Sequence, residues 1–274
     1  MADRNDTPFY VGYLDMPKAL KGPARLIALV LLLIAGLAAA WIASGARDAG
    51  QGYWGYGIEQ TLTGRIALAP YPMLQVAGEA PQTVLLVVEG KLGAEAFVAP
   101  FDGQMVEVTG YDIHRGPWRM LELRTADDVK PVAGAGLTVA EGLPQPLGRV
   151  TLKGEIIDSK CFLGVMKPGE GPVHRACATL CILGGIPPMF ALKDVAGNRA
   201  AYLLTDAAGN QVNDAVPPYV ADPVEISGTL ERRGDILVLK ADMGSVRRLV
   251  GDELVAYGPR LIEGIENAIC TLPG

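Results

Sequence analysis

The chain has 274 residues, of which 24 are basic and 30 acidic, and its formal net charge is −6 at pH 7. Residues 1–25 hold four basic and three acidic side chains, so the remainder carries 20 basic against 27 acidic. This acidic excess argues against nucleic acid and anionic lipid surfaces as partners, because binding phosphate groups requires a basic face that releases counterions.

The first predicted element is a transmembrane helix. Half of the chain is hydrophobic, and residues 26–44 form a run of nineteen without a charge, about the length that a hydrocarbon core of roughly 30 Å requires. A cleaved signal peptide is the alternative, because small residues follow the run at Ala43 and Ser44. The run is longer than a typical signal core and 25 residues precede it, which favours an uncleaved helix over residues 26–44.

The charges that flank this helix predict its orientation. Lys18, Lys21 and Arg25 crowd its N-terminal side, whereas Arg47 and Asp48 nearly cancel on the other side. By the positive-inside rule, residues 1–25 form a cytoplasmic tail and the bulk of the chain is exported. We therefore expect a single-pass protein of a bacterial inner membrane, with its C-terminal domains in the periplasm.

The exported part contains an internal repeat. Residues 61–66, Thr-Leu-Thr-Gly-Arg-Ile, return ninety positions later as Thr-Leu-Lys-Gly-Glu-Ile at 151–156. Residues 106–110, Val-Glu-Val-Thr-Gly, return 118 positions later as Val-Glu-Ile-Ser-Gly at 224–228. Both copies consist of short β-branched runs separated by Gly-containing turns, a pattern that predicts strands and hairpins.

Each copy accounts for five strands, with a glycine in or just after the first and the fourth. This order is typical of the small oligonucleotide/oligosaccharide-binding (OB) barrel. We therefore predict a mainly β protein in which the transmembrane helix is followed by two tandem OB-like five-stranded barrels, at 55–148 and 149–246. A single β-sandwich is the alternative.

The second copy is longer than the first, and one of its insertions carries cysteine and histidine. If residues 173–183 form a helix, His174, Cys177 and Cys181 are spaced i, i+3 and i+7 and share one face. The first copy has no thiol at the equivalent stretch, Ala69 to Met73. Folding therefore does not require the insertion, and we expect any chemistry to belong to the second copy, with the first as scaffold or partner-binding surface.

The second copy resembles a group of small exported OB-like domains with a D-S-x-C motif followed by C-x-x-x-C. Here the motif is Asp158-Ser159-Lys160-Cys161, followed by Cys177 to Cys181. The resemblance covers roughly a third of the chain and implies fold and exported location. That group has no assigned activity, so the resemblance supplies no catalytic residues.

The thiols have two main interpretations. Exported thiols tend to oxidise, so Cys161 is predicted to form a disulfide with Cys177 or Cys181, with the remaining thiol free or paired with Cys270. Such a loop of roughly fifteen to twenty residues would stabilise the fold by about 3 kcal/mol. Alternatively, Cys161, His174, Cys177 and Cys181 form a Cys₃His set that suits Zn²⁺ or Cu(I).

Haem is a third candidate ligand, with His174 as axial ligand, although no C-x-x-C-H attachment motif is present. The chain has only two histidines and lacks a thioredoxin-type C-x-x-C, a Walker loop and a dinucleotide fingerprint. We therefore predict no catalytic residue and do not expect an enzyme.

The last predicted element is an amphipathic helix within residues 247–274. Apolar residues recur there at helical spacing, from Leu261 and Ile262 to Ile265 and Ile269. The function expected from the whole pattern is that of a non-catalytic accessory or assembly subunit of a membrane-bound redox or transport complex, with an integral membrane complex as partner. The alternative is a metal- or haem-handling protein that uses the Cys/His cluster.

Overall fold

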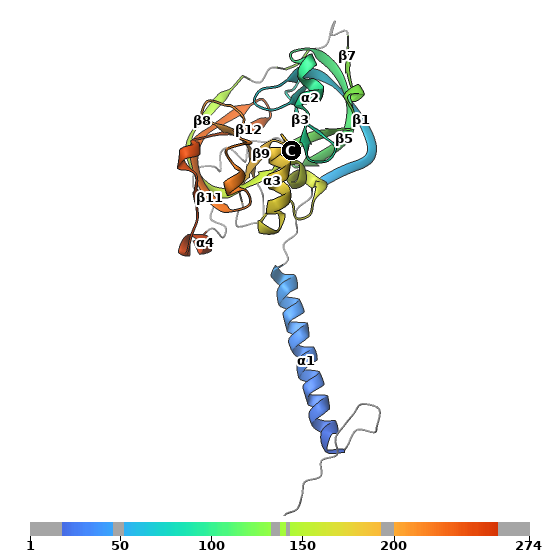
Figure 1. Cartoon of the computed structure of the whole chain (residues 1–274), viewed down its shortest axis with the longest axis vertical. Helices are drawn as coiled ribbons and strands as arrows, with labels where there is room; N and C mark the ends of the chain where they lie inside the picture. Colours follow the sequence, from blue (N-terminus) through green and yellow to red (C-terminus); the bar gives the residue numbers. More distant parts are fainter. Residues whose placement is uncertain (1–17, 46–51, 133–137, 141–142, 193–199, 257–274) are drawn as a thin grey trace, which may run out of the picture. The chain divides into compact units, whose positions relative to one another are not determined.

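The computed structural model describes residues 18–45, 52–132, 138–140, 143–192 and 200–256. The chain divides into two compact units, Met1–Asp48 and Ala49–Gly274 (Figure 1). The first contains one long helix and the second is mainly β. Both features agree with the sequence prediction.

Helix α1, Lys18–Gly45, contains the predicted apolar run. Its segment Ala19–Ala40 is long and apolar enough to cross a membrane, and none of it is buried within the protein. A helix with leucine and isoleucine exposed on every side is stable in hydrocarbon and poorly soluble in water. The observation is consistent with a single-pass anchor.

The first half of the β unit is one seven-stranded sheet. Its order is β1-β2-β3-β6-β5-β7; β4 also pairs with β3, and β5 pairs with β1. All pairs are antiparallel except β3 with β6. The strands are β1 Tyr53–Ala67, β2 Met73–Val76, β3 Thr83–Val88, β4 Leu92–Gly93, β5 Met105–Arg115, β6 Trp118–Leu123 and β7 Val129–Pro131. The short helices are α2 Glu95–Val98, η1 Ala99–Phe101 and η2 Ala126–Asp128.

The second half contains a closed five-stranded barrel, as predicted. The order β12-β10-β9-β8-β11-β13 closes through a further pairing of β12 with β11, and β10 is parallel to β12. Its strands are β8 Gln145–Asp158, β9 Pro188–Ala191, β10 Ala201–Asp206, β11 Pro223–Arg233, β12 Ile236–Ala241 and β13 Arg247–Arg248. Near the end of the described chain lie η5 Pro217–Tyr219, η6 Met243–Ser245 and α4 Asp252–Ala256.

The sequence repeat is also a repeat of strand register. Gly64 faces Val106 across β1 and β5, and Gly154 faces Val224 across β8 and β11. Gly154 follows Gly64 by 90 residues, and Val224 follows Val106 by 118. The two pairs therefore consist of residues that the sequence repeat makes equivalent. The hydroxyl groups of Thr61 and Thr109 lie 2.9 Å apart, and those of Thr151 and Ser227 lie 2.8 Å apart. Equivalent residues therefore make equivalent cross-strand contacts in the two halves.

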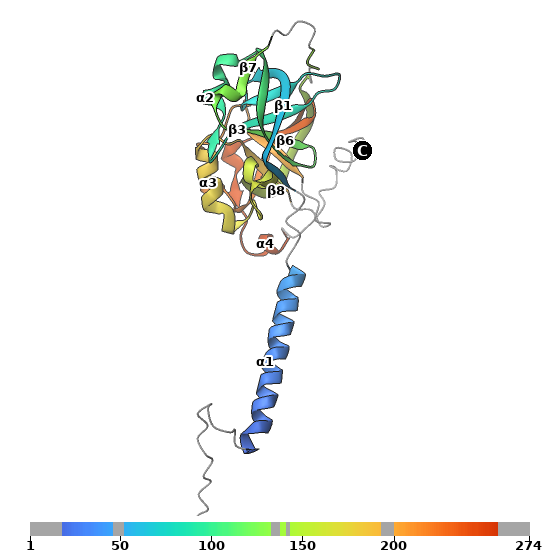
Figure 2. The ribbon, with the colours of Figure 1, turned by 90° about the vertical axis from the view of Figure 1, so that its right-hand side faces the viewer.

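The insertion between β8 and β9 forms the helical segment expected from the sequence. It comprises the π-type turn η3, Cys161–Val165, then η4, Pro172–His174, and α3, Arg175–Leu183. Figures 1 and 2 show α3 beside the part of the first sheet that contains β3. The insertion therefore lies where the two halves of the β unit meet.

Besides a core of its own in each half, one hydrophobic core is shared by the two halves. It contains Leu85 and Met120 from the first half together with Cys161, Cys181 and Leu203 from the second. Polar contacts cross the same boundary: the Tyr71 hydroxyl donates to Leu204 O at 2.7 Å and the Trp118 indole to Ala201 O at 3.1 Å. The predicted segments 55–148 and 149–246 thus pack together as a single unit rather than as separate bodies.

The amphipathic helix predicted within residues 247–274 does not include the first two residues of that range. Arg247 and Arg248 form β13, paired with β11, instead of entering a helix. An ion pair of 2.8 Å between Arg247 and Glu225 supports this pairing. Helix α4 covers residues 252–256. The apolar stripe predicted over 259–270, and Cys270 with it, lie outside the described residues.

Candidate thiol and metal centre

The aspartate of the D-S-x-C motif organises the start of the site. Asp158 ends β8, and its Oδ1 accepts a hydrogen bond of 2.8 Å from the backbone N–H of Cys161. A short polar side chain that bonds to the backbone three residues later turns the chain out of its strand. Asp158 Oδ2 lies 3.0 Å from His174 Nε2, and both side chains are buried. One carboxylate therefore fixes both the first cysteine and the imidazole.

Helix α3 supplies the other two thiols. Cys181 is buried and Cys177, one turn earlier, is half-buried. The face with Ala178 and Ile182 packs into the core of the second half, which aims the cysteine face toward the boundary with the first half. The helix ends at Gly184 and Gly185, and Gly185 adopts a positive φ of 97° that terminates helices readily.

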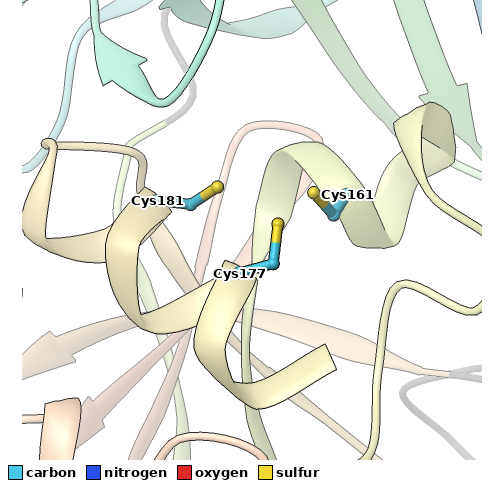
Figure 3. Close-up of side chains that lie close together, drawn as sticks. All are labelled: Cys161, Cys177 and Cys181. Atoms are coloured by element: carbon cyan, nitrogen blue, oxygen red, sulfur yellow. The ribbon is translucent and has the colours of Figure 1, made fainter. Parts of the chain in front are cut away.

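The three thiols converge on one point. The sulfur atoms of Cys161, Cys177 and Cys181 all lie within 4.8 Å of one another. Figure 3 shows Cys177 and Cys181 projecting from the same helix toward Cys161 on the neighbouring turn. Sulfur atoms that share one metal ion at roughly 2.3 Å are about 4 Å apart. The sulfur triangle therefore has the dimensions of a metal site.

The thiols also polarise one another. The pKa of Cys181 is lowered to about 7: the hydrogen bond with Cys161 is the largest cause, the charge of Lys91 acts in the same direction, and burial opposes both. The same hydrogen bond raises the pKa of Cys161, as does burial. These opposite shifts favour Cys161 as the donor and Cys181 as the thiolate acceptor.

A lysine from the first half lies against these sulfurs. Lys91, in the turn between β3 and β4, donates to Cys177 Sγ at 2.7 Å, and its Nζ is 3.7 Å from Cys181 Sγ. The hydrogen bond to Cys177 raises the pKa of Lys91, so the side chain stays cationic. The charge balance of the centre thus depends on both halves of the β unit.

Close backbone contact fixes the turn that carries Lys91. Gly93 N donates to Gly184 O at 2.8 Å, immediately after the cysteine helix. A Cβ atom at Gly184 would lie 1.8 Å from the Lys91 carbonyl oxygen, closer than any side chain allows. Glycine at position 184 is therefore what permits the turn to sit against α3.

A buried ion pair holds the same turn from the other side. Lys160, the neighbour of Cys161, is 3% exposed and lies 2.5 Å from Glu122 Oε1. Its Nζ also donates to Val88 O at 2.9 Å and Gly90 O at 2.7 Å. The Trp54 indole donates to the second oxygen of Glu122 at 2.9 Å. These added hydrogen bonds compensate for the desolvation of a buried pair.

The predicted site residues divide into two groups. Cys161, Cys177 and Cys181 come together, whereas His174 forms a second buried group with Asp158 and Cys161. Cys161 belongs to both groups, and His174 Nε2 is bonded to Asp158 in the second of them. The Cys₃His set as one four-ligand cluster stays a prediction.

The predicted disulfide between Cys161 and the 177–181 segment is absent. All three described cysteines are free thiols. Their mutual hydrogen bonds and the Lys91 ammonium satisfy the sulfurs without a covalent link. Cys270, the candidate partner of the remaining thiol, lies in the part of the chain that the structure does not describe.

Sequence reasoning missed Lys91, Lys160 and the positioning role of Asp158. Asp158 and Lys160 stand within the motif, but a motif does not show which atoms they contact. Lys91 carries no local signal, since only the packing of one half on the other brings it to the thiols.

The chain matches no protein-family model and no curated protein sequence. The functional assignment therefore rests on the chemistry of the centre itself.

Proposed function

We propose that this protein binds a thiophilic metal ion through Cys161, Cys177 and Cys181 and handles it for a membrane-bound redox or transport complex. The observation that carries the proposal is the convergence of three free sulfurs, from two separate segments, within 4.8 Å. Of the two functions expected from the sequence, this arrangement favours the metal-handling one, combined with an accessory rather than a catalytic role.

The donor set defines the class of ion. Thiolate sulfur selects soft or borderline ions such as Cu(I) and Zn²⁺, whereas Mg²⁺ and Ca²⁺ require oxygen ligands. A thiolate is already favoured at Cys181, whose lowered pKa reflects the hydrogen bond from Cys161. A bound ion would also protect the thiols of an exported protein from oxidation.

The surface beside Cys177 supports delivery to a protein partner. Four large apolar side chains are exposed on α3, on the turn before it and on β4: Val173 at 85%, Leu180 at 56%, Leu183 at 54% and Leu92 at 56%. Cys177 and Leu180 are spaced i and i+3 on α3 and so lie on one face of it, and Val173 is in the turn η4 that leads into this helix. An apolar rim around a half-buried ligand suits transient docking of an acceptor protein.

The membrane anchor and the barrels complete the proposal. We place α1 in a bacterial inner membrane with the basic residues Lys18, Lys21 and Arg25 on the cytoplasmic side, so that the thiol centre is periplasmic. We also assign both halves to the OB-like class. The pairing order β1-β2-β3-β6-β5 with return to β1, and its parallel pair β3/β6, match those of the second-half barrel.

The test is metal content. The full chain, purified anaerobically in detergent and incubated with Zn²⁺ or chelated Cu(I), is expected to retain about one ion per chain. Cys177→Ser is expected to reduce retention at least about tenfold, because a hydroxyl replaces a soft thiolate. Cys270→Ser is the matched control, since it also removes one thiol, and should retain the ion. A wild-type chain that holds no ion, or a Cys177→Ser variant that holds as much, would contradict the proposal.

A further inference from the structure

We infer that the thiol centre selects a monovalent, three-coordinate ion, Cu(I), over Zn²⁺, and that Lys91 is the residue that sets this preference. The inference rests on the proposed function and deepens it by naming the ion. Two independent observations carry it: the number of ligands that converge, and the cation that lies against them.

The ligand count is three. Within the ranges that the structure describes, the groups of potential ligands contain three sulfurs around one point, with His174 assigned to a different group. Structural zinc sites are tetrahedral and take four protein ligands. His174 is held by Asp158 through Nε2, at 3.0 Å, and stands outside the group of three sulfurs. Three sulfurs, with which the described part of the chain groups no fourth donor, suit the soft, monovalent Cu(I) better.

The charge of Lys91 acts in the same direction. Its ammonium group has three N–H donors and no lone pair, so it cannot serve as the fourth ligand while it donates to Cys177. It attracts the thiolates whichever ion is bound, but it repels the ion in proportion to the ion's own charge. A divalent ion therefore meets twice the repulsion that Cu(I) meets.

The position of Lys91 is built into the fold. Its side chain is exposed, but its backbone is held by the Gly93–Gly184 contact on one side and by Lys160 bonded to Gly90 on the other. Lys160 adjoins Cys161, and Gly184 follows Cys181 by three residues. The two segments that carry the thiols thus also hold the turn that carries the cation.

Uptake involves no electron transfer. Each thiol that bonds to the ion releases its proton to solvent, the copper remains Cu(I), and Lys91 keeps its proton. The ion is supplied already reduced, as a chelate, and the chelator is released when the sulfurs replace it.

The experiment compares two affinities in three variants. Anaerobic full-length protein in detergent is titrated with Cu(I) against a chromophoric Cu(I) chelator, and with Zn²⁺ against a chromophoric Zn²⁺ chelator. Lys91→Met removes the charge and keeps an unbranched side chain, Lys91→Arg keeps the charge, and Lys130→Met removes an exposed lysine from the edge strand β7. Melting temperatures verify that each variant is folded.

Lys91→Met is expected to shift the ratio of Zn²⁺ to Cu(I) affinity about tenfold toward Zn²⁺, as removal of one unit charge a few ångströms away predicts. Lys91→Arg and Lys130→Met should keep the wild-type ratio, and X-ray absorption should show copper with sulfur neighbours only. An unchanged ratio in Lys91→Met, or a nitrogen ligand on copper, overturns this inference while leaving a metal-binding protein. Failure of the wild type to bind either ion overturns the proposed function itself.

Discussion

The two halves of the β unit share one pattern of strand pairing and differ mainly in one connection. In the first half, residues 68–72 join β1 to β2, and Tyr71 turns into the shared core. In the second half, residues 159–187 join β8 to β9 and carry all three described thiols. The same pattern of strand pairing therefore accepts either a short connection or a long insertion that carries thiols at this place.

The first half, which carries none of the three described thiols, also contributes to the thiol centre. The expectation that chemistry belongs to the second copy alone holds for the thiols, but Lys91 comes from the first copy. The first half contributes a charge and a tight backbone contact, while the second contributes the ligands. Three substitutions test how strongly the two halves depend on each other.

The largest effect is expected at the buried ion pair. Lys160→Met leaves Glu122 charged and buried without its partner, and should lower the free energy of unfolding by about 3–5 kcal/mol. Denaturant unfolding of the purified chain measures the change. Lys153→Met is the matched control, because Lys153 is partly exposed and 3.8 Å from Glu225, and it should cost under about 1 kcal/mol.

The same pair allows a sharper check. Adding Glu122→Gln to Lys160→Met removes the unpaired charge, so the double variant should be more stable than Lys160→Met alone. If the two changes are simply additive, the ion pair does not couple the halves.

The next effect concerns the backbone contact at the cysteine helix. Gly184→Val places a side chain where the Lys91 carbonyl lies 1.8 Å from a Cβ position, which should cost about 3 kcal/mol through forced separation of the turn from α3. Metal affinity should fall with it, since Lys91 and α3 move apart. Gly78→Ala, at a position with open space around it, is the control and should melt like the wild type.

The smallest expected effect is the loss of stability when the hydroxyl of a buried tyrosine is removed, and it should differ between Tyr71 in the first half and Tyr202 in the second. The Tyr71 hydroxyl donates to Leu204 O and accepts from Val212 N, so Tyr71→Phe should cost about 1–3 kcal/mol by leaving buried groups unsatisfied. The Tyr202 hydroxyl is buried and has no hydrogen-bond partner among the described residues, so Tyr202→Phe should be neutral or slightly stabilising. Equal losses in the two variants would refute this assignment of the hydrogen bonds across the halves.

Much of the fold could be read from the sequence because it depends on local patterns. The offsets of 90 and 118 residues were visible as repeated letters, and the structure pairs those positions in register. The helix over 173–183 followed from residue types and the Gly-Gly stop, and it forms as η4 and α3.

The site was only half predictable. Spacing on a helix placed His174 on the same face as the cysteines, but spacing does not reveal that the imidazole is bonded to Asp158. The shared core and Lys91 depend on which sheet faces pack together, and alternation along a strand shows only that a face is buried. The amphipathic helix over 259–270 and the pairing of Cys270 stay predictions.

The shared core restricts how such a protein can evolve. Cys161 and Cys181 are buried partly by residues of the first half, so a chain that lost residues 52–132 would leave the inner side of its thiol centre open to water. Each half therefore forms part of the interior of the other. Substitutions at the exposed rim around Cys177 would leave this shared interior intact, whereas loss of either half would expose it.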